Sequence, residues 1–384
     1  MERWNAVETS FFGKGSISLL SGELRKRGHK RALIVTDKFL YDTGVAAKVG
    51  NEVLKAGCEY AIYYEVKPNP TVEIVEECLE AAKVLGVDML IAVGGGSAID
   101  TCKAVSIVLA NGGRVEDYEG ENKSSKRGMP IAVVNTTAGT GSEVTSFYIV
   151  TDTKRHSKMC MVDPNCLVSI AINDADFMMS MPKGLTAATG MDALTHAIEA
   201  ALTWKATPLT DKDAYWAINV IKTYLPRAVE NGNDEQAREM MAYAEYVAGM
   251  AFSNAGLGLV HAMAHAMGGF YNLPHGVCNA VLLPYVMEFN GKEPATWEGF
   301  QKIAAALEIP GAASMNGEEA VKACVKTVRE LSQQVGIPKK LSELKVKPED
   351  FEALASLAVV DACADANPVK VNKQTIVSVY RSAF

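Results

Sequence analysis

The sequence lacks the features that mark membrane-spanning, secreted and nucleic-acid-binding proteins. No apolar run approaches the roughly 18 residues that a membrane helix requires, and the N-terminal stretch contains no apolar segment typical of a signal peptide. With a formal net charge of −7, the chain has no excess of Lys and Arg for binding a phosphate backbone. We therefore expect no membrane association and no nucleic-acid partner.

Ordered cysteine spacings are also missing. The eight cysteines form neither a CxxC pair nor a regular framework. In a chain of 384 residues this pattern is typical of reduced, buried thiols, and it predicts a cytoplasmic protein. What is present is ordinary for a globular protein, with 48% hydrophobic and 22% charged residues, and the length suggests two domains.

The first part of the chain alternates short apolar runs with stretches of helical periodicity. A period of two in residues 148–152 and 157–163 predicts a hairpin at the edge of a sheet. The apolar runs are rich in β-branched residues and predict the strands of a mostly parallel sheet with helices on both faces; they cover residues 31–37, 61–66, 88–93, 130–135 and 168–173.

After Met181 and Pro182 the periodicity becomes helical and stays so to Phe384, with almost no strand signal. The sequence therefore predicts a fold of class α/β plus all-α. We expect a parallel-sheet domain over residues 1–182 and a helical domain over residues 183–384.

A glycine-rich turn joins a predicted strand to a predicted helix at Gly94, Gly95, Gly96 and Ser97. Glycines let the backbone approach a pyrophosphate without Cβ clashes, and a helix start offers N–H groups and a positive dipole end. We interpret the turn as a phosphate-binding site rather than a plain tight turn. The GxGxxG fingerprint of many dinucleotide-binding folds is absent, so the order of strands is not predicted.

Two further segments follow predicted strands. Asp37 closes the strand 31–37, where a carboxylate can accept hydrogen bonds from an adenosine ribose and disfavour the 2′-phosphate of NADP, or can cap the following helix. The sequence leaves both roles open. Residues 136–143 combine hydroxyls and glycines, and we interpret them as a loop that holds phosphate or nicotinamide rather than as a polar turn.

The sequence contains only six histidines, and four lie in otherwise apolar parts of the helical half. Asp192 and His196 are four residues apart, as are His261 and His265, so each pair shares one helix face. Burying several imidazoles beside a carboxylate is costly without a partner, which favours a divalent metal over isolated core histidines. Spacing alone selects Asp192, His196, His261 and His265 as the ligands. In the alternative, His275 replaces His265 as a ligand, and His265 handles protons.

Four motifs in order resemble the iron-containing alcohol dehydrogenase family, and the resemblance runs from FFGKGS at residues 11–16 to the C-terminal helices. The motifs are GGGSAID at 94–100, TTAGTGSEVT at 136–145, GMDALTHAIE at 190–199 and GLGLVHAMAHAMGGFYNLPHG at 256–276. The resemblance implies a Rossmann-like NAD-binding domain, a helical iron-binding domain with the active site between them, and pairing into homodimers or larger oligomers.

The family pattern also implies roles for individual residues. It makes Asp192, His196, His261 and His275 the iron ligands and His265 a catalytic residue, while an N3O ligand set by itself also permits Zn²⁺. By analogy with the pockets of the family we predict substrate contacts at Phe147, Phe252 and Cys363. The alternative is that they are core residues, and for Cys363 the sequence leaves both interpretations open. The predicted contacts with NAD are Asp37, Asn69, Gly94, Gly95, Gly96, Ser97, Asp100, Thr136, Thr137, Thr140, Phe147 and Lys158.

The resemblance thus predicts hydride transfer between NAD(H) and a small alcohol or aldehyde. Within the family the chain is most similar to enzymes that interconvert lactaldehyde and 1,2-propanediol, although Phe147 stands where those enzymes tend to carry a polar Asn. Ala98 and Ala266-Met267 are further departures. The alternatives are another short-chain alcohol or 1,3-propanediol dehydrogenase, a zinc-dependent glycerol dehydrogenase, a dehydroquinate synthase-like lyase, and a catalytically silent NAD-binding protein.

Overall fold

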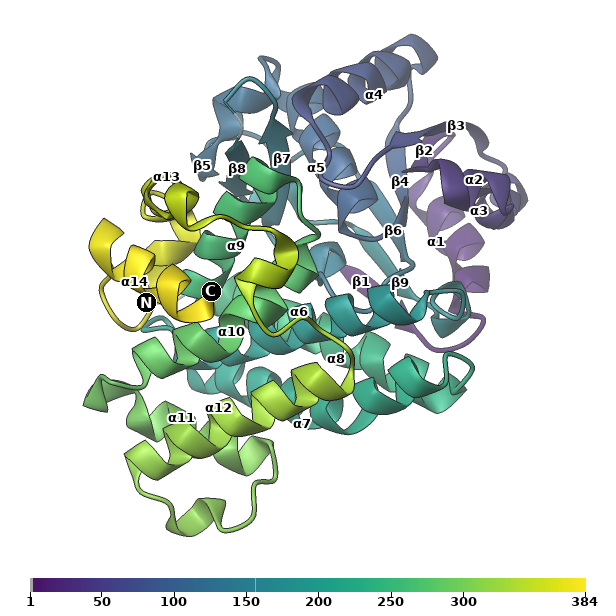
Figure 1. Ribbon diagram of the computed structural model, residues 1–384. Helices are drawn as coiled ribbons and strands as arrows, with labels where there is room; N and C mark the ends of the chain where they lie inside the picture. The colour runs from purple at the N-terminus through teal and green to yellow at the C-terminus, as the bar shows by residue number, and fades with distance from the viewer. Residues whose placement is uncertain (1–2, 156) are drawn as a thin grey trace. The chain divides into compact units, whose positions relative to one another are not determined.

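The computed structural model describes residues 3–155 and 157–384 (Figure 1). The chain forms two compact units. The first comprises the chain up to Thr137 together with residues 141–180, and the second comprises Ala138–Thr140 together with Met181–Phe384. The short loop 138–140, which follows a strand of the first unit, thus belongs to the second unit by its contacts.

The first unit is built on a six-stranded parallel sheet, as the sequence predicts. Strand β2 has the predicted bounds, and β3, β4, β6 and β9 lie within one or two residues of theirs. Strand β1 was not predicted. The spatial order is β1 (Thr9–Phe12), β9 (Ile170–Asn173), β6 (Ile131–Asn135), β4 (Met89–Gly94), β2 (Arg31–Asp37) and β3 (Glu59–Val66).

Helices cover both faces of this sheet. Helices α1 (Leu20–Arg27) and α3 (Val45–Lys55) share one core cluster with alternate residues of the central strands, such as Ile34 and Ile91. Helices α4 (Val72–Leu85) and α5 (Gly96–Asn111) contact each other and strands β3 and β4. The short helix α2 (Lys38–Asp42) follows β2 directly. Strands covered on both faces are apolar along their whole length, which explains the continuous runs in the sequence.

The predicted hairpin forms, but its predicted place at the edge of the main sheet is wrong. Strands β7 (Phe147–Asp152) and β8 (Ser157–Val162) are antiparallel, and β8 also pairs with β5 (Gly120–Glu121) to make a separate three-stranded sheet. The edge beside β9 is taken by β1. The buried amine of Lys103 on α5 donates to the carbonyl oxygens of Thr145 and Phe147, at 2.7 Å each, and so ties the hairpin to α5.

The second unit is helical, and residues 181–384, all of which are described, contain no strand. Helix α6 is almost wholly buried and contacts α7, α8 and α10, so it forms the centre of the unit. Its many small residues allow this close packing. The helices are α6 (Lys183–Leu202), α7 (Pro208–Glu230), α8 (Glu235–Ala255), α9 (Leu259–Tyr271), α10 (His275–Asn290), α11 (Trp297–Ala306), α12 (Gly317–Gln334), α13 (Phe351–Ala358) and α14 (Lys373–Ala383).

Within the described residues, no single helix combines the length and the apolar character needed to cross a membrane. Helices α8 and α9, which meet at a bend of 103°, satisfy that test only as a pair and only by length and composition.

Candidate metal centre and nucleotide site

Three helices of the second unit bring a carboxylate and three imidazoles together. Asp192 and His196 lie one turn apart on α6, His261 lies near the start of α9, and His275 is the first residue of α10. The start of α10 packs directly against α6, because a Cβ added to Gly276 would lie 2.4 Å from the carbonyl oxygen of Ala188. Glycine after His275 is therefore what allows that imidazole to reach Asp192.

The four side chains converge on one point. The distances from Asp192 Oδ1 to Nε2 of His196, His261 and His275 are 4.0, 3.8 and 3.7 Å. One ligand atom from each residue lies within 4.8 Å of all the others. An ion about 2.1 Å from four tetrahedral ligands holds them roughly 3.4 Å apart, so a small contraction would suffice to bind one.

The charge state of the site suits a metal ion. Burial lowers the pKa of His196 and His261 well below the usual histidine value, which leaves neutral imidazoles with a lone pair to offer. Asp192 is 2% exposed and supplies the negative charge. The ring of Phe252 stacks on His196 with 4.3 Å between centroids, so the predicted substrate residue Phe252 does lie at this centre.

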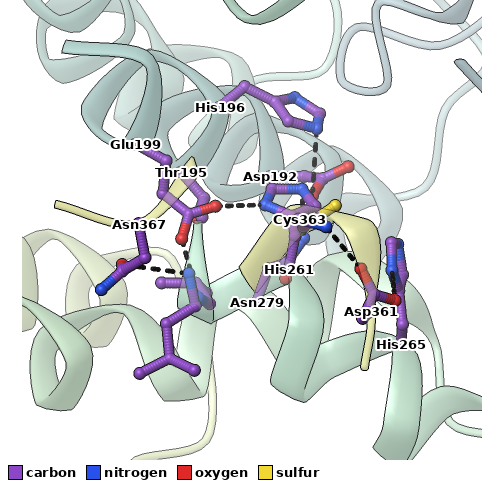
Figure 2. Close-up of polar contacts among 12 residues, drawn as sticks. Asp192, Thr195, His196, Glu199, His261, His265, Asn279, Asp361, Cys363 and Asn367 are labelled. Atoms are coloured by element: carbon purple, nitrogen blue, oxygen red, sulfur yellow. Dashed lines mark hydrogen bonds and ion pairs between the residues drawn. The ribbon is translucent and has the colours of Figure 1, made fainter. Parts of the chain in front are cut away.

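A buried carboxylate orients one of the ligands. Glu199 Oε2 lies 2.6 Å from Nδ1 of His261, and its other oxygen accepts the N–H of Val260 at 2.7 Å (Figure 2). Burial raises the pKa of Glu199 to about 7, against the opposing effect of the N–H groups of Val260 and Gly258. With Nδ1 directed at Glu199, the Nε2 atom of His261 faces the other ligands. The sequence analysis missed Glu199, although it lies on α6 in the same motif as His196.

An amide completes the cluster. Asn279 is fully buried on α10, one turn after His275. Its Nδ2 atom donates to Asp192 Oδ1 at 2.6 Å and lies 3.0 Å from His261 Nε2 and 3.1 Å from His275 Nε2. The sequence analysis missed this residue too; the i, i+4 spacing to His275 was the available signal.

His265 belongs to a different group. It lies one turn after His261 on α9 but clusters with Asp361 and Cys363 rather than with the four residues above, so the set chosen by spacing alone is not the one that converges. Its Nδ1 is 2.9 Å from Asp361 Oδ2, and Asp361 Oδ1 accepts the N–H of Cys363 at 2.8 Å (Figure 2). The ring also stacks on His275, with centroids 5.3 Å apart. His265 is therefore adjacent to the convergent site and has its own carboxylate.

In the first unit, two predicted cofactor loops lie against each other. Strand β4 ends at Gly94, and α5 begins at Gly96 with Gly95 as its N-terminal cap. A Cβ added to Gly95 would lie 2.6 Å from Oγ1 of Thr137, and the N–H of Thr136 donates to the carbonyl of Gly94 at 3.2 Å. The glycine turn (residues 94–97) and the start of the threonine loop (Thr136 and Thr137) therefore form one surface at the start of α5, where an anion is favoured.

Two acidic residues near this surface have partners within the protein. Asp37 caps α2 by accepting the N–H of Leu40 at 2.9 Å, which uses one of its two oxygens. Asp100 accepts the hydroxyl of Ser142 at 2.6 Å and the N–H of Ile149 at 3.1 Å. Asp100 thus joins α5 to the hairpin, and a contact with a cofactor would be a second role for this residue.

The other predicted residues are spread over both units. Lys158 lies on β8 and Phe147 begins β7, both partly exposed, while Asn69 occupies the turn after β3 with a φ of 55°. Thr140 is in the segment assigned to the second unit. Cys363, 2% exposed, lies beside Asp361 in the second unit.

Comparison with known proteins shows which family the chain matches. Residues 8–175 match the family described as iron-containing alcohol dehydrogenase, and residues 186–384 match the Fe-containing alcohol dehydrogenase family, C-terminal. The chain is 45% identical over 379 residues to lactaldehyde reductase of Escherichia coli (strain K12), with 98% of each chain covered.

Two other proteins are similar along their whole length. The chain is 42% identical over 375 residues to the NAD-dependent methanol dehydrogenase of Bacillus methanolicus, with 98% of each covered. A solved structure of 1,3-propanediol oxidoreductase superposes with a TM-score of 0.96 at 41% identity, covering both chains completely. With both halves matched and relatives of this similarity, the protein belongs to the iron-containing alcohol dehydrogenase family.

Proposed function

We propose that this alcohol and aldehyde oxidoreductase holds one Fe²⁺ ion at Asp192, His196, His261 and His275, and that it uses NAD(H) to interconvert a small alcohol and its aldehyde. The observation that carries the proposal is the convergence of these four side chains, with Asp192 Oδ1 3.7 to 4.0 Å from the three Nε2 atoms. One carboxylate and three neutral imidazoles leave a dication with a net positive charge. When bound, such an ion supplies Lewis acidity toward an alcohol or carbonyl oxygen.

The ligands alone fit Fe²⁺ and Zn²⁺ equally well, because an N3O set is borderline in softness. Membership of the iron-containing family favours iron. Glu199 supports either metal, since it fixes the orientation of His261 and keeps the lone pair on Nε2.

His265 and Asp361 are suited to holding and moving the proton of the substrate hydroxyl. The imidazole is adjacent to His275, and Asp361 lies 2.9 Å from its Nδ1 atom. Burial alone would raise the pKa of Asp361, but the neighbouring His265 and the N–H of Cys363 bring it below its usual value. Asp361 therefore holds the His265 ring through Nδ1 and leaves its Nε2 atom to exchange a proton with the substrate.

For NAD we propose the glycine turn at residues 94–97 as the pyrophosphate site and the threonine loop from Thr136 to Thr140 as a second contact. The proximity of Gly95 and Thr137 supports a single binding surface. Asp37, at the carboxyl end of β2, supports NAD over NADP, because a carboxylate there repels a 2′-phosphate.

Among substrates we favour lactaldehyde and 1,2-propanediol, on the strength of 45% identity to a lactaldehyde reductase. Similar identities to enzymes named for methanol and for 1,3-propanediol keep other short alcohols as the second candidate. The apolar Phe147 and Phe252 offer no hydrogen bond to a second hydroxyl, and this feature supports the second candidate. We further propose a cytoplasmic homodimer or larger homo-oligomer, as the family resemblance implies.

The test is anaerobic purification with Fe²⁺, and in parallel with Zn²⁺, followed by NADH oxidation with a panel of short aldehydes and hydroxyaldehydes. We expect NADH consumption equal to aldehyde consumed, with Fe²⁺ giving the higher rate. An enzyme that turns over substrate without net change in NADH would contradict the proposal and indicate a lyase. Activity on glycerol with Zn²⁺ alone would instead favour the glycerol dehydrogenase alternative.

A further inference from the structure

The amide of Asn279 lies among the atoms that the proposed cation would use. Its Nδ2 atom is 2.6 Å from Asp192 Oδ1, 3.0 Å from His261 Nε2 and 3.1 Å from His275 Nε2. The carboxylate of Asp192 has only lone pairs, and Nδ1 of His261 is directed at Glu199, so Asp192 Oδ1 and His261 Nε2 are acceptors. His275 Nε2 accepts in its contact with Asn279, because an amide nitrogen can only donate. Three acceptors that lie close together in a buried site repel one another, and the amide N–H groups offset that repulsion.

The amide and a cation compete for the same lone pairs. An ion bound by Asp192, His261 and His275 takes the electron pairs toward which the N–H groups of Asn279 now point. The amide would therefore have to give up at least its two histidine contacts when an ion binds. The amide oxygen of Asn279, Oδ1, is buried and has no hydrogen-bond partner. In the observed orientation the amide nitrogen is hydrogen-bonded and the amide oxygen is not.

We propose that Asn279 is a positioning residue that acts as an internal stand-in for the cation. It holds three ligands from α6, α9 and α10 together in the metal-free protein and gives up its histidine contacts when the ion binds. This inference rests on the proposed ligand set. Its physical consequence is that Asn279 stabilises the metal-free protein more than the metal-loaded protein, and so lowers the affinity for the metal while keeping the site assembled.

The test compares thermal unfolding of the metal-free and metal-loaded forms in wild type and two variants. Asn279→Asp keeps the size of the side chain but replaces the donor with an anion beside Asp192, and Asn279→Leu removes both polar ends. We expect the unfolding temperature of the metal-free form to fall much more than that of the loaded form. The gap between the two forms should increase from wild type to Asn279→Leu to Asn279→Asp.

Metal affinity provides an independent readout. By linkage, a variant that destabilises only the metal-free form binds the ion more tightly, and we expect Asn279→Leu to lower the Kd for Fe²⁺ or Co²⁺ by about tenfold in competition with a chelator. Asn290→Leu is the matched control. That asparagine is buried on α10, but its amide pairs with Asn367, whose Oδ1 also accepts the N–H of Leu259 near His261, so a second control is Thr296→Val. Thr296 is buried in the second unit, and within the described residues its hydroxyl donates only to the carbonyl oxygens of Asn290 and Glu293, so its loss should affect both forms equally.

Each outcome is decisive. An equal loss of stability in both forms, or weaker metal binding by the Asn279 variants, would overturn the inference and make Asn279 a packing residue or a support for the loaded site. If Asn279→Leu does not fold without metal but folds with it, the inference holds. Failure of the wild-type protein itself to bind a divalent cation would instead contradict the proposed function.

Discussion

Two histidines on one helix lie in different surroundings, and we propose different roles for them. His261 and His265 are one turn apart on α9, both are buried, and each has a carboxylate at its Nδ1 atom. Glu199, beside His261, has its pKa raised to about 7 by burial. Asp361, beside His265, is also buried, yet its pKa lies below the usual value because His265 and the N–H of Cys363 lower it.

The difference between the two pairs indicates what each can do. Burial lowers the pKa of His261 well below its usual value, so this imidazole stays neutral and suits a metal ligand. His265 lies beside Asp361, which holds the ring through Nδ1 next to His275, and this placement suits the proposed role in proton transfer. The carboxylate that faces each ring, rather than the histidine itself, therefore distinguishes the two proposed roles.

The largest effect is expected from His261→Ala. We predict that this variant binds no Fe²⁺ and has no measurable turnover, because it removes one of four ligands. NAD affinity should stay close to wild type, since the predicted NAD contacts lie elsewhere in the chain. Metal analysis and NADH binding by fluorescence check this. Loss of both metal and NAD binding would point to unfolding and would not support the assigned role.

His265→Ala is the matched variant on the same helix. We predict that it keeps its metal and loses about 10²-fold in kcat, because the proposed proton carrier is gone. The measurement is kcat as a function of pH with metal content determined on the same sample. Full turnover across the pH range with metal retained would eliminate the distinction between the two histidines.

Glu199→Gln tests the partner of His261 without changing its shape. A neutral amide holds the imidazole less strongly than a carboxylate, so we expect the Kd for the metal to rise about tenfold, with kcat of the fully loaded enzyme little changed. Chelator competition measures the Kd. An unchanged affinity would mean that the packing of α9 alone orients His261.

The last prediction concerns stability rather than the metal or turnover: Asp361→Asn should destabilise the protein by roughly 1–3 kcal/mol through the loss of a buried, charged acceptor. The folded pKa of Asp361 lies below its usual value. Its contribution to stability is therefore present above the unfolded pKa and is lost as the pH falls through the folded value.

The difference in unfolding temperature between wild type and Asp361→Asn should thus stay constant from about pH 8 to pH 5 and shrink below roughly pH 4. Thermal unfolding of the metal-free proteins over this range is the measurement. A difference that grows as the pH falls would show that the pKa of Asp361 is raised, not lowered, in the folded protein.

The sequence by itself determined the secondary structure that supports the site. Continuous β-branched runs indicated the buried strands, because a strand covered on both faces has no polar side. The i, i+4 spacing of Asp192 and His196 indicated a shared helix face, since that relation depends only on helical geometry. These features are local, and local features can be read from neighbouring residues.

Spacing along the chain could not decide which side chains meet, and the sequence selected His275 over His265 only through the family resemblance. His275 joins the ligand group and His265 does not, because Gly276 lets α10 pack against the backbone of α6. Asp361, 96 residues from His265, reaches it from a different segment of the chain. The hairpin formed as predicted, but it pairs with β5 in a separate sheet, while β1 occupies the edge of the main sheet beside β9. Spacing along a chain fixes which residues share an element, and only the packing of elements brings residues from separate elements into contact.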